Sequence, residues 1–208
     1  MVQANRDGPE RSAMDDRVKI VGETVLSKDW GLLKKTSFDL QRRDGTWQRQ
    51  SRETYDRGNA AAILLYCVAN DTVILTRQFR FPVFVGGHDA WLIEVCAGLL
   101  DGDDPETCAR REAAEETGHA VEDIRHVFDI ETSPGSVIER LSCFIGTYDA
   151  KSRISDGGGL HAEGEDIEVL QFGLKAALAM IDSGAIVDAK TILLLQYLAL
   201  HPDAVNAR

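Results

Sequence analysis

The chain has 208 residues, of which 44% are hydrophobic and 27% are charged, and this is the composition of one globular domain or of one domain with a small appendage. No run approaches the roughly 20 apolar residues of a membrane span. Residues 1–16 are polar and lack the basic segment followed by an apolar segment that is typical of an export signal. We therefore expect a soluble cytoplasmic protein without a membrane partner. The net charge of −11 argues against a nucleic-acid partner, because nucleic-acid binding depends on Lys and Arg contacts to phosphates.

The N-terminal part of the chain alternates between apolar and polar residues in the manner of β-strands. Residues 1–16 lack this periodicity and are expected to form a mobile tail. The alternation predicts strands at 18–26, 31–40 and 47–55. An Asp-Gly turn signal separates the last two, so the pattern favours an antiparallel meander. Two apolar runs, 61–68 and 72–79, then predict a buried hairpin.

The clearest helix signal follows a strand-like run at residues 91–100. Asp104 can cap the helix, Pro105 suits its first position, and Gly118 stands where a helix usually ends. The remaining pattern predicts strands at 124–131, 141–148 and 167–172 and helices at 174–183 and 189–200. This order of elements predicts an α+β fold, a sandwich in which helices cover a mixed central sheet.

The predicted helix is unusually acidic in its C-terminal half. Glu112, Glu115 and Glu116 lie where negative charge is unfavourable by roughly a few tenths of a kcal/mol each. Glu112 and Glu116 are four residues apart and therefore share one face, and Glu115 is three from Glu112. A hard divalent cation such as Mg²⁺ relieves repulsion between converging carboxylates. The alternative is a solvated helix whose acids pair with Arg110 and Arg111.

The residues in front of the helix favour a metal site. Gly98 lets the backbone approach a ligand, and the carbonyl of Ala97 can supply a further metal oxygen. The four cysteines form no Cys-x-x-Cys pair and the five histidines are isolated, so a zinc site and a disulfide scaffold have little support. We expect reduced, mostly buried thiols.

Residues 98–119, GLLDGDDPETCARREAAEETGH, resemble the Nudix box. The matching positions are Gly98, Arg111, Glu112, Ala113, Glu115, Glu116 and Gly118. Three positions depart from the consensus. The spacing from Gly98 to Arg111 is one residue short, Asp104 stands where the first Glu is expected, and His119 replaces the final aliphatic residue.

The resemblance extends over roughly residues 18–200 and is to the ADP-ribose and GDP-mannose pyrophosphatase branch of the Nudix hydrolases. The motifs that carry it are ETYDRGNAAAILLY, RQFR, IEVCAGLLD, SPGSVIE, EGEDIEV and IVDAKTILLLQYL. The shortened acidic turn and AKTILLLQYL are most similar to the GDP-mannose hydrolases. The resemblance implies an α/β/α sandwich at 59–203 and an N-terminal meander at 17–58 that reaches across to the partner subunit of a homodimer.

The resemblance also implies roles for individual residues. The metal ligands would be Ala97 through its carbonyl, Glu112, Glu116 and Glu165, with Mg²⁺ as the ion and Mn²⁺ as a substitute. Glu163 is assigned as the base that activates water, and Glu115 is its rival. Substrate contacts are expected from Trp30, Arg52, Glu53, Arg80, Gly98, Leu99, Glu139 and Lys190. Taken alone, each of these charges is more often a surface or loop residue without such a role.

These features predict Mg²⁺-dependent hydrolysis of the diphosphate of a nucleoside diphosphate sugar similar to GDP-mannose, giving a nucleoside monophosphate and a sugar 1-phosphate. One alternative is an ADP-ribose pyrophosphatase that releases AMP and ribose 5-phosphate. A second is a non-catalytic nucleotide-sugar sensor, expected to have lost Glu112 or Glu116 or gained a DNA-binding segment. A third is a structural acidic domain, which predicts no metal-dependent turnover.

Overall fold

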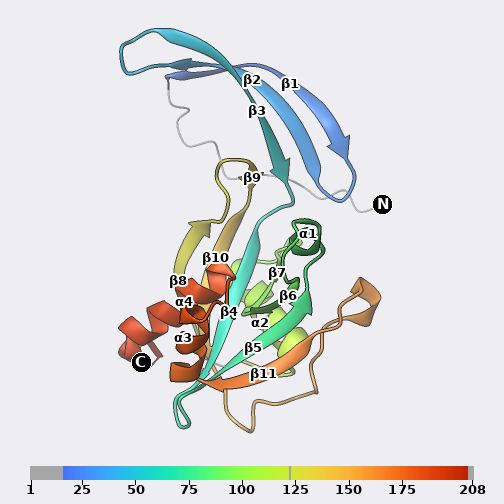
Figure 1. The fold of residues 1–208 in the computed structure, drawn as a ribbon, viewed down its shortest axis with the longest axis vertical. Helices are drawn as coiled ribbons and strands as arrows, with labels where there is room; N and C mark the ends of the chain where they lie inside the picture. Colours follow the sequence, from blue (N-terminus) through green and yellow to red (C-terminus); the bar gives the residue numbers. More distant parts are fainter. Residues whose placement is uncertain (1–15, 122, 206–208) are drawn as a thin grey trace. The chain divides into compact units, whose positions relative to one another are not determined.

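A computed structural model of the chain describes residues 16–121 and 123–205, so the tail expected at residues 1–16 lies almost entirely outside the described residues (Figure 1). The described residues form two compact units. Those up to Asn59 and Glu131–Glu139 belong to the first, and Ala60–Ile130 and the residues from Arg140 onward belong to the second. None of the helices in the described part of the chain is long and apolar enough to cross a bilayer.

The first unit is a four-stranded sheet in the order β1-β2-β3-β9. Its strands are β1 (Val18–Lys28), β2 (Leu32–Gln41), β3 (Trp47–Asp56) and β9 (Val137–Ile138). The first three strands form the predicted antiparallel meander, whereas β9 runs parallel to β3 and is too short to be visible in the sequence pattern. The β2–β3 turn depends on Asp44, whose carboxylate accepts from the Thr46 amide at 3.0 Å, and on Gly45 with φ of +85°.

The second unit is built on a mixed sheet with the path β11-β5-β4-β10-β8, on which β6 pairs with β5 and β7 pairs with β4. Its strands are β4 (Ala60–Cys67), β5 (Thr72–Phe79), β6 (Trp91–Glu94), β7 (Cys96–Leu99), β8 (Ile124–Glu131), β10 (Arg140–Thr147) and β11 (Glu168–Gly173). Its helices are α1 (Phe81–Val85), α2 (Pro105–Thr117), α3 (Leu174–Asp182) and α4 (Ala189–Leu200), with 3₁₀ turns at His161–Glu163 and Pro202–Val205.

Strand β4 separates two apolar layers. Ala60, Ala62 and Leu64 pack with residues of α3 and α4, whereas Ala61, Ile63 and Leu65 pack with residues of α2. Because successive side chains of a strand point to opposite faces, a run that is apolar throughout buries both faces of the sheet. Figure 1 shows α3 and α4 together on one face, and the fold is the expected α+β sandwich.

The run predicted as one strand at residues 91–100 is divided at Val95. The Val95 amide donates to the Thr191 hydroxyl of α4 at 2.8 Å. Before Val95 the chain pairs with β5 as β6, and after it the chain pairs with β4 as β7. This break brings β7 alongside β4, with Ala62 opposite Ala97. The interruption depends on a residue almost a hundred positions away, and local periodicity cannot reveal it.

Helix α2 has the predicted ends. The Asp104 carboxylate accepts from the amides of Glu106 and Thr107, both at 3.1 Å, and Pro105 occupies the first turn. Gly118 ends the helix in the left-handed region with φ of +74°. These caps fix the register of the helix, and therefore the direction in which its acidic side chains point.

Candidate active site

Two glutamates of α2 are buried and lie near a third carboxylate from the loop before β11. Glu112 is 7% exposed and Glu116 is 1% exposed. Burial, with a contribution from Glu165, raises the pKa of Glu112 to about 7. Burial and the charges of Glu112 and Glu165 raise the pKa of Glu116 to about 8. The structure thus places three of the predicted metal ligands within electrostatic range of one another.

Gly98 is required by the position of the Glu112 carboxylate. A Cβ atom at Gly98 would lie 1.9 Å from Glu112 Oε1 and 2.1 Å from its Cδ. The carboxylate therefore rests directly on the Cα atom of β7, beside Ala97. The sequence led us to expect that this glycine admits a ligand, whereas in the structure the space beside it holds the Glu112 side chain.

Glu116 has one carboxylate oxygen with an unmet bonding requirement. The backbone of Ala97 and the thiol of Cys96 hydrogen-bond to this carboxylate. Its Oε2 atom is buried and is the only such side-chain atom in the described part of the chain without a hydrogen-bond partner. An unpaired buried oxygen is costly, and a hard cation with oxygen ligands would satisfy it. The Glu116 carboxylate is therefore suited to bind a divalent metal ion.

Arg111 bonds two of the acidic side chains of α2 and a carbonyl of β7. Its guanidinium bonds Glu112 Oε1 at 2.7 Å, Glu115 Oε2 at 3.3 Å and the Leu99 carbonyl at 3.1 Å. The salt bridge between Glu115 and Arg111 that we considered at the sequence level is therefore present. Within residues 16–121 and 123–205, no three His, Cys, Asp or Glu side chains form a group that could hold a metal ion in this arrangement.

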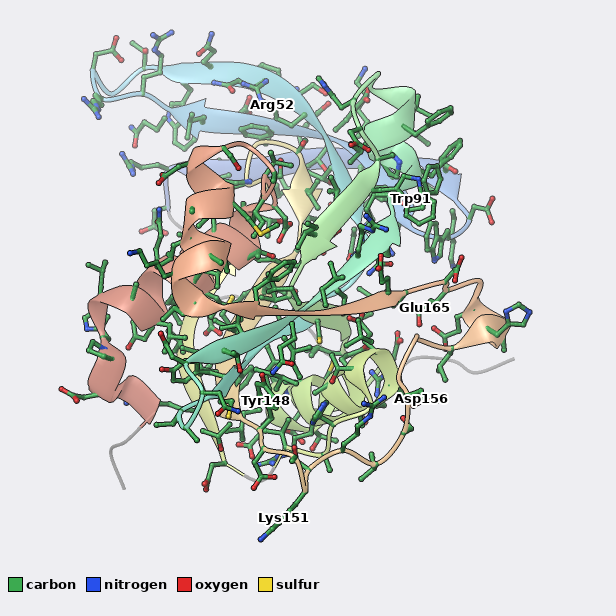
Figure 2. All side chains as sticks on the ribbon, turned by 60° about the horizontal axis from the view of Figure 1, so that its bottom comes forward. Arg52, Trp91, Tyr148, Lys151, Asp156 and Glu165 are labelled. Atoms are coloured by element: carbon green, nitrogen blue, oxygen red, sulfur yellow. The ribbon has the colours of Figure 1, made fainter. Side chains whose placement is uncertain are left out.

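The two predicted loop acids have different environments. Glu165 (Figure 2) accepts from the Leu160 amide at 2.8 Å, and its charge contributes to the raised pKa of both α2 glutamates. Glu163 ends the exposed 3₁₀ turn of the same loop. The loop therefore presents one acid to the buried glutamates and another to solvent.

The predicted cations Arg80 and Lys190 share one buried acid, Glu94, that sequence reasoning missed. Arg80 forms a bidentate pair with Glu94 at 2.8 and 2.9 Å, and Lys190 bonds both Glu94 and Asp188. Burial opposes the charge on Lys190, but Glu94 and Asp188 outweigh it and hold its pKa above the ordinary value. Glu94 lies in an apolar run, WLIEVCAG, where a lone acid at a buried strand position was the available signal.

Arg80 also reaches toward the carboxylates. Glu116 is among the charges that raise the pKa of Arg80 against the effect of burial, and the Arg80 side chain is 37% exposed. The guanidinium can therefore meet an anionic ligand while Glu94 fixes its orientation. Lys190 lies at the start of α4, as expected, but its ammonium is committed to two carboxylates. Its role as a substrate contact stays a prediction.

The remaining predicted contacts belong to the first unit. Trp30 is 80% exposed, and the guanidinium of Arg57 lies 4.3 Å from the centre of its ring. Arg52 and Glu53 are adjacent residues of β3, and Arg52 bonds the Ser51 carbonyl and Gln50 (Figure 2). Glu139 accepts from the Thr132 hydroxyl at 2.7 Å. Their roles in substrate binding stay predictions.

Two family models match the chain. The NUDIX domain model matches residues 56–172, and a model described as the GDP-mannose pyrophosphatase NudK N-terminal domain matches residues 17–55. The chain belongs to the Nudix family and is a Nudix hydrolase. Nudix hydrolases generally use a divalent metal ion.

Particular relatives are similar along most of the chain. A GDP-mannose pyrophosphatase of Pectobacterium atrosepticum is 51% identical over 185 residues, which cover 88% of this chain and 95% of the relative. A GDP-mannose pyrophosphatase of Cronobacter sakazakii is 48% identical over 189 residues, covering 90% and 98%. One of Salmonella typhimurium is 47% identical over 186 residues, covering 89% and 96%.

The raised pKa of Glu116 predicts a pH-dependent cost in the metal-free protein. The pKa of Glu116 is about 8 in the folded protein against an ordinary value of 4.5. The folded state therefore binds this proton more tightly, and the stabilisation that results is fully present below pH 4.5 and is lost as pH rises through 8. The free energy of unfolding falls by at most about 1.4 kcal/mol per pH unit in this range. In EDTA, Glu116→Gln should therefore melt above wild type at pH 8 and match it near pH 5, as measured by calorimetry.

An exposed acid of the same helix provides the control for this measurement. Glu106→Gln removes one charge from α2 at a side chain that is 52% exposed. Its melting temperature should follow that of wild type across the pH range. Parallel curves for wild type and Glu116→Gln would contradict the assignment of a buried, proton-binding carboxylate at this position.

Proposed function

We propose that this chain hydrolyses the diphosphate of a nucleoside diphosphate sugar similar to GDP-mannose, using Mg²⁺ held by Glu112, Glu116, Glu165 and the Ala97 carbonyl. The buried, unpartnered oxygen of Glu116 among like charges carries the proposal, because it needs a cation. The relatives support the substrate class, since those with similarity along the chain act on GDP-mannose by name.

When bound, the metal ion supplies charge neutralisation for the diphosphate and activates water. The chain supplies the remaining requirements. Arg80, oriented by Glu94, faces an anionic ligand with part of its guanidinium. Water then adds to one phosphorus, the bridging oxygen leaves with the other phosphate, and the products are a nucleoside monophosphate and a sugar 1-phosphate. The four free, buried cysteines support a reducing cytoplasm as the location.

We assign Glu163 as the general base. It lies on the exposed end of the acidic loop and can approach a water molecule when that loop closes on substrate. Glu115 is the alternative, but its carboxylate already pairs with Arg111 at 3.3 Å. This contact restricts the movement of the Glu115 side chain, whereas Glu163 is free to move in solvent, and this difference favours Glu163.

A substrate panel tests the proposed function. With Mg²⁺, GDP-mannose should be hydrolysed with a higher kcat/KM than ADP-ribose, ADP-glucose or NADH, with products identified by chromatography. Glu116→Gln should fold but lose nearly all turnover, because it removes a charge from a hard-cation site without opening a cavity. A tenfold or greater preference for ADP-ribose would show that the proposed substrate class is wrong, while hydrolysis of a diphosphate would still hold. Wild-type turnover by Glu116→Gln would refute the metal site.

A pair of neutralising substitutions tests the assignment of the base. Glu163→Gln should lower kcat by roughly 100-fold or more with little change in KM, because it removes proton transfer without removing a binding group. Glu115→Gln should cost less, since it loses one contact of Arg111. Steady-state rates for both variants decide between them, and a larger loss for Glu115→Gln would exchange the two roles.

We also propose that the protein forms a homodimer. Two apolar surfaces in separate units support this. Strand β1 exposes Ile20, Val21, Val25 and Leu26 along an edge strand. The second unit exposes an aromatic patch around α1, formed by Phe79, Phe81, Phe84, Val85 and Trp91, which are 42 to 67% exposed. Neighbouring rings lie 5.6 to 6.4 Å apart. Contiguous exposed patches of this kind usually mark an interface.

Light scattering of the purified protein at micromolar concentration should give the mass of two chains. Phe84→Asp should shift the protein toward the monomer, because it places a charge in the aromatic patch. Leu200→Asp provides the matched control, since Leu200 is 76% exposed and belongs to α4 rather than to the patch. A monomeric wild type, or equal dissociation of both variants, would be incompatible with this interface.

A further inference from the structure

The loop between β10 and β11 is bound to the C-terminal end of α2 by its backbone. The Ile154 amide donates to the Gly118 carbonyl at 2.7 Å. The Gly158 and Gly159 amides donate to the carbonyls of Glu116 and Glu115 at 2.9 and 3.1 Å. A helix leaves its last carbonyls without partners inside the helix, so the loop satisfies the backbone of the same residues that carry the acidic side chains.

Three consecutive glycines make this contact possible. Gly157, Gly158 and Gly159 have φ of +70°, +106° and +79°, a region that residues with a Cβ atom rarely adopt. A Cβ atom at Gly157 would lie 2.6 Å from the Glu116 carbonyl oxygen. The run is therefore a requirement of the close backbone approach between the loop and α2.

Gly159 additionally defines the position of the Glu165 side chain. A Cβ atom at Gly159 would lie 2.5 Å from Glu165 Oε2 and 2.8 Å from Glu165 Cβ. The next amide, that of Leu160, donates to the same Oε2 atom at 2.8 Å, and the Ile167 amide donates to the Gly158 carbonyl at 3.1 Å. The Glu165 carboxylate is thus packed on the Cα atom of Gly159 and aligned by the backbone beside it.

We propose that Gly159 is a positioning residue for the metal site. It holds the Glu165 carboxylate beside the buried glutamates of α2 by leaving space that any larger residue would fill. This inference rests on the proposed function, in which Glu165 binds the metal ion. It adds that the site is assembled by main-chain contacts between α2 and residues 157–159, before any metal ion arrives.

Gly164 offers a matched control within the same loop. Its φ of +77° differs by 2° from that of Gly159, but a Cβ atom there would meet nothing within 4 Å. An alanine at either position has the same cost of a left-handed backbone. Only Gly159→Ala collides with Glu165, so a difference between the two variants reports that collision.

The experiment measures Mn²⁺ binding to the substrate-free protein by electron paramagnetic resonance of the free ion. Gly159→Ala should raise the Kd by roughly tenfold or more, as expected when a group that orients a metal ligand is disturbed, and Gly164→Ala should stay within about twofold of wild type. In a Glu165→Gln background, Gly159→Ala should add little. Equal effects of the two alanines, or a full effect of Gly159→Ala without the Glu165 carboxylate, would overturn the inference.

Two further measurements keep this test decisive. Wild type that neither binds Mn²⁺ nor turns over substrate would overturn the proposed function and this inference together, whereas a binding wild type with equivalent alanine variants overturns the inference alone. If Gly159→Ala does not fold, amide exchange in metal-free wild type replaces it. The Gly158 and Gly159 amides should be protected there, and rapid exchange at both would overturn the assembly of the site before metal binding.

Discussion

Mutual repulsion between carboxylates that are withdrawn from water is the constraint around which the second unit is organised. Glu112 and Glu116 are buried on one helix, and Glu165 adds a third negative charge from a separate loop. Such a group of charges is unfavourable in the metal-free protein. Contacts from the surrounding residues hold the carboxylates in place. The helix caps fix the direction of α2, Gly98 gives room to the Glu112 carboxylate, and Arg111 donates to the same carboxylate.

The sheet makes this placement rigid. Alanines in β4 lie opposite Ala97 and Gly98 of β7, so the two strands and α2 pack closely with small side chains. On the other face, α3 and α4 cover the same strand. A shift of α2 would therefore disturb the apolar layer that α2 shares with β4, and the close packing of that layer makes such a shift costly.

Much of this arrangement was accessible from sequence, and the failures have a common cause. The strands, the ends of α2 and the Nudix box are local patterns, and the fold class followed from them. The division at Val95 depends on Thr191, and the burial of Glu94 depends on Arg80 and Lys190, all supplied by distant elements. Helix α1 and strand β9 were missed because five and two residues carry no period. Charge patterns singled out candidate residues, but only three-dimensional contacts revealed which of these charges pair with one another.

The acidic loop has two parts with different freedom to vary. The segment at residues 154–159 is held against α2 by main-chain hydrogen bonds, whereas the turn at His161–Glu163 is exposed. Main-chain bonds do not depend on side-chain identity, apart from the glycines that admit them. Changes in the outer turn can therefore alter the position of Glu163 while the main-chain bonds at residues 154–159 stay in place. The two acids of one loop are thus held independently, Glu165 by the backbone contacts to α2 and Glu163 by the exposed turn.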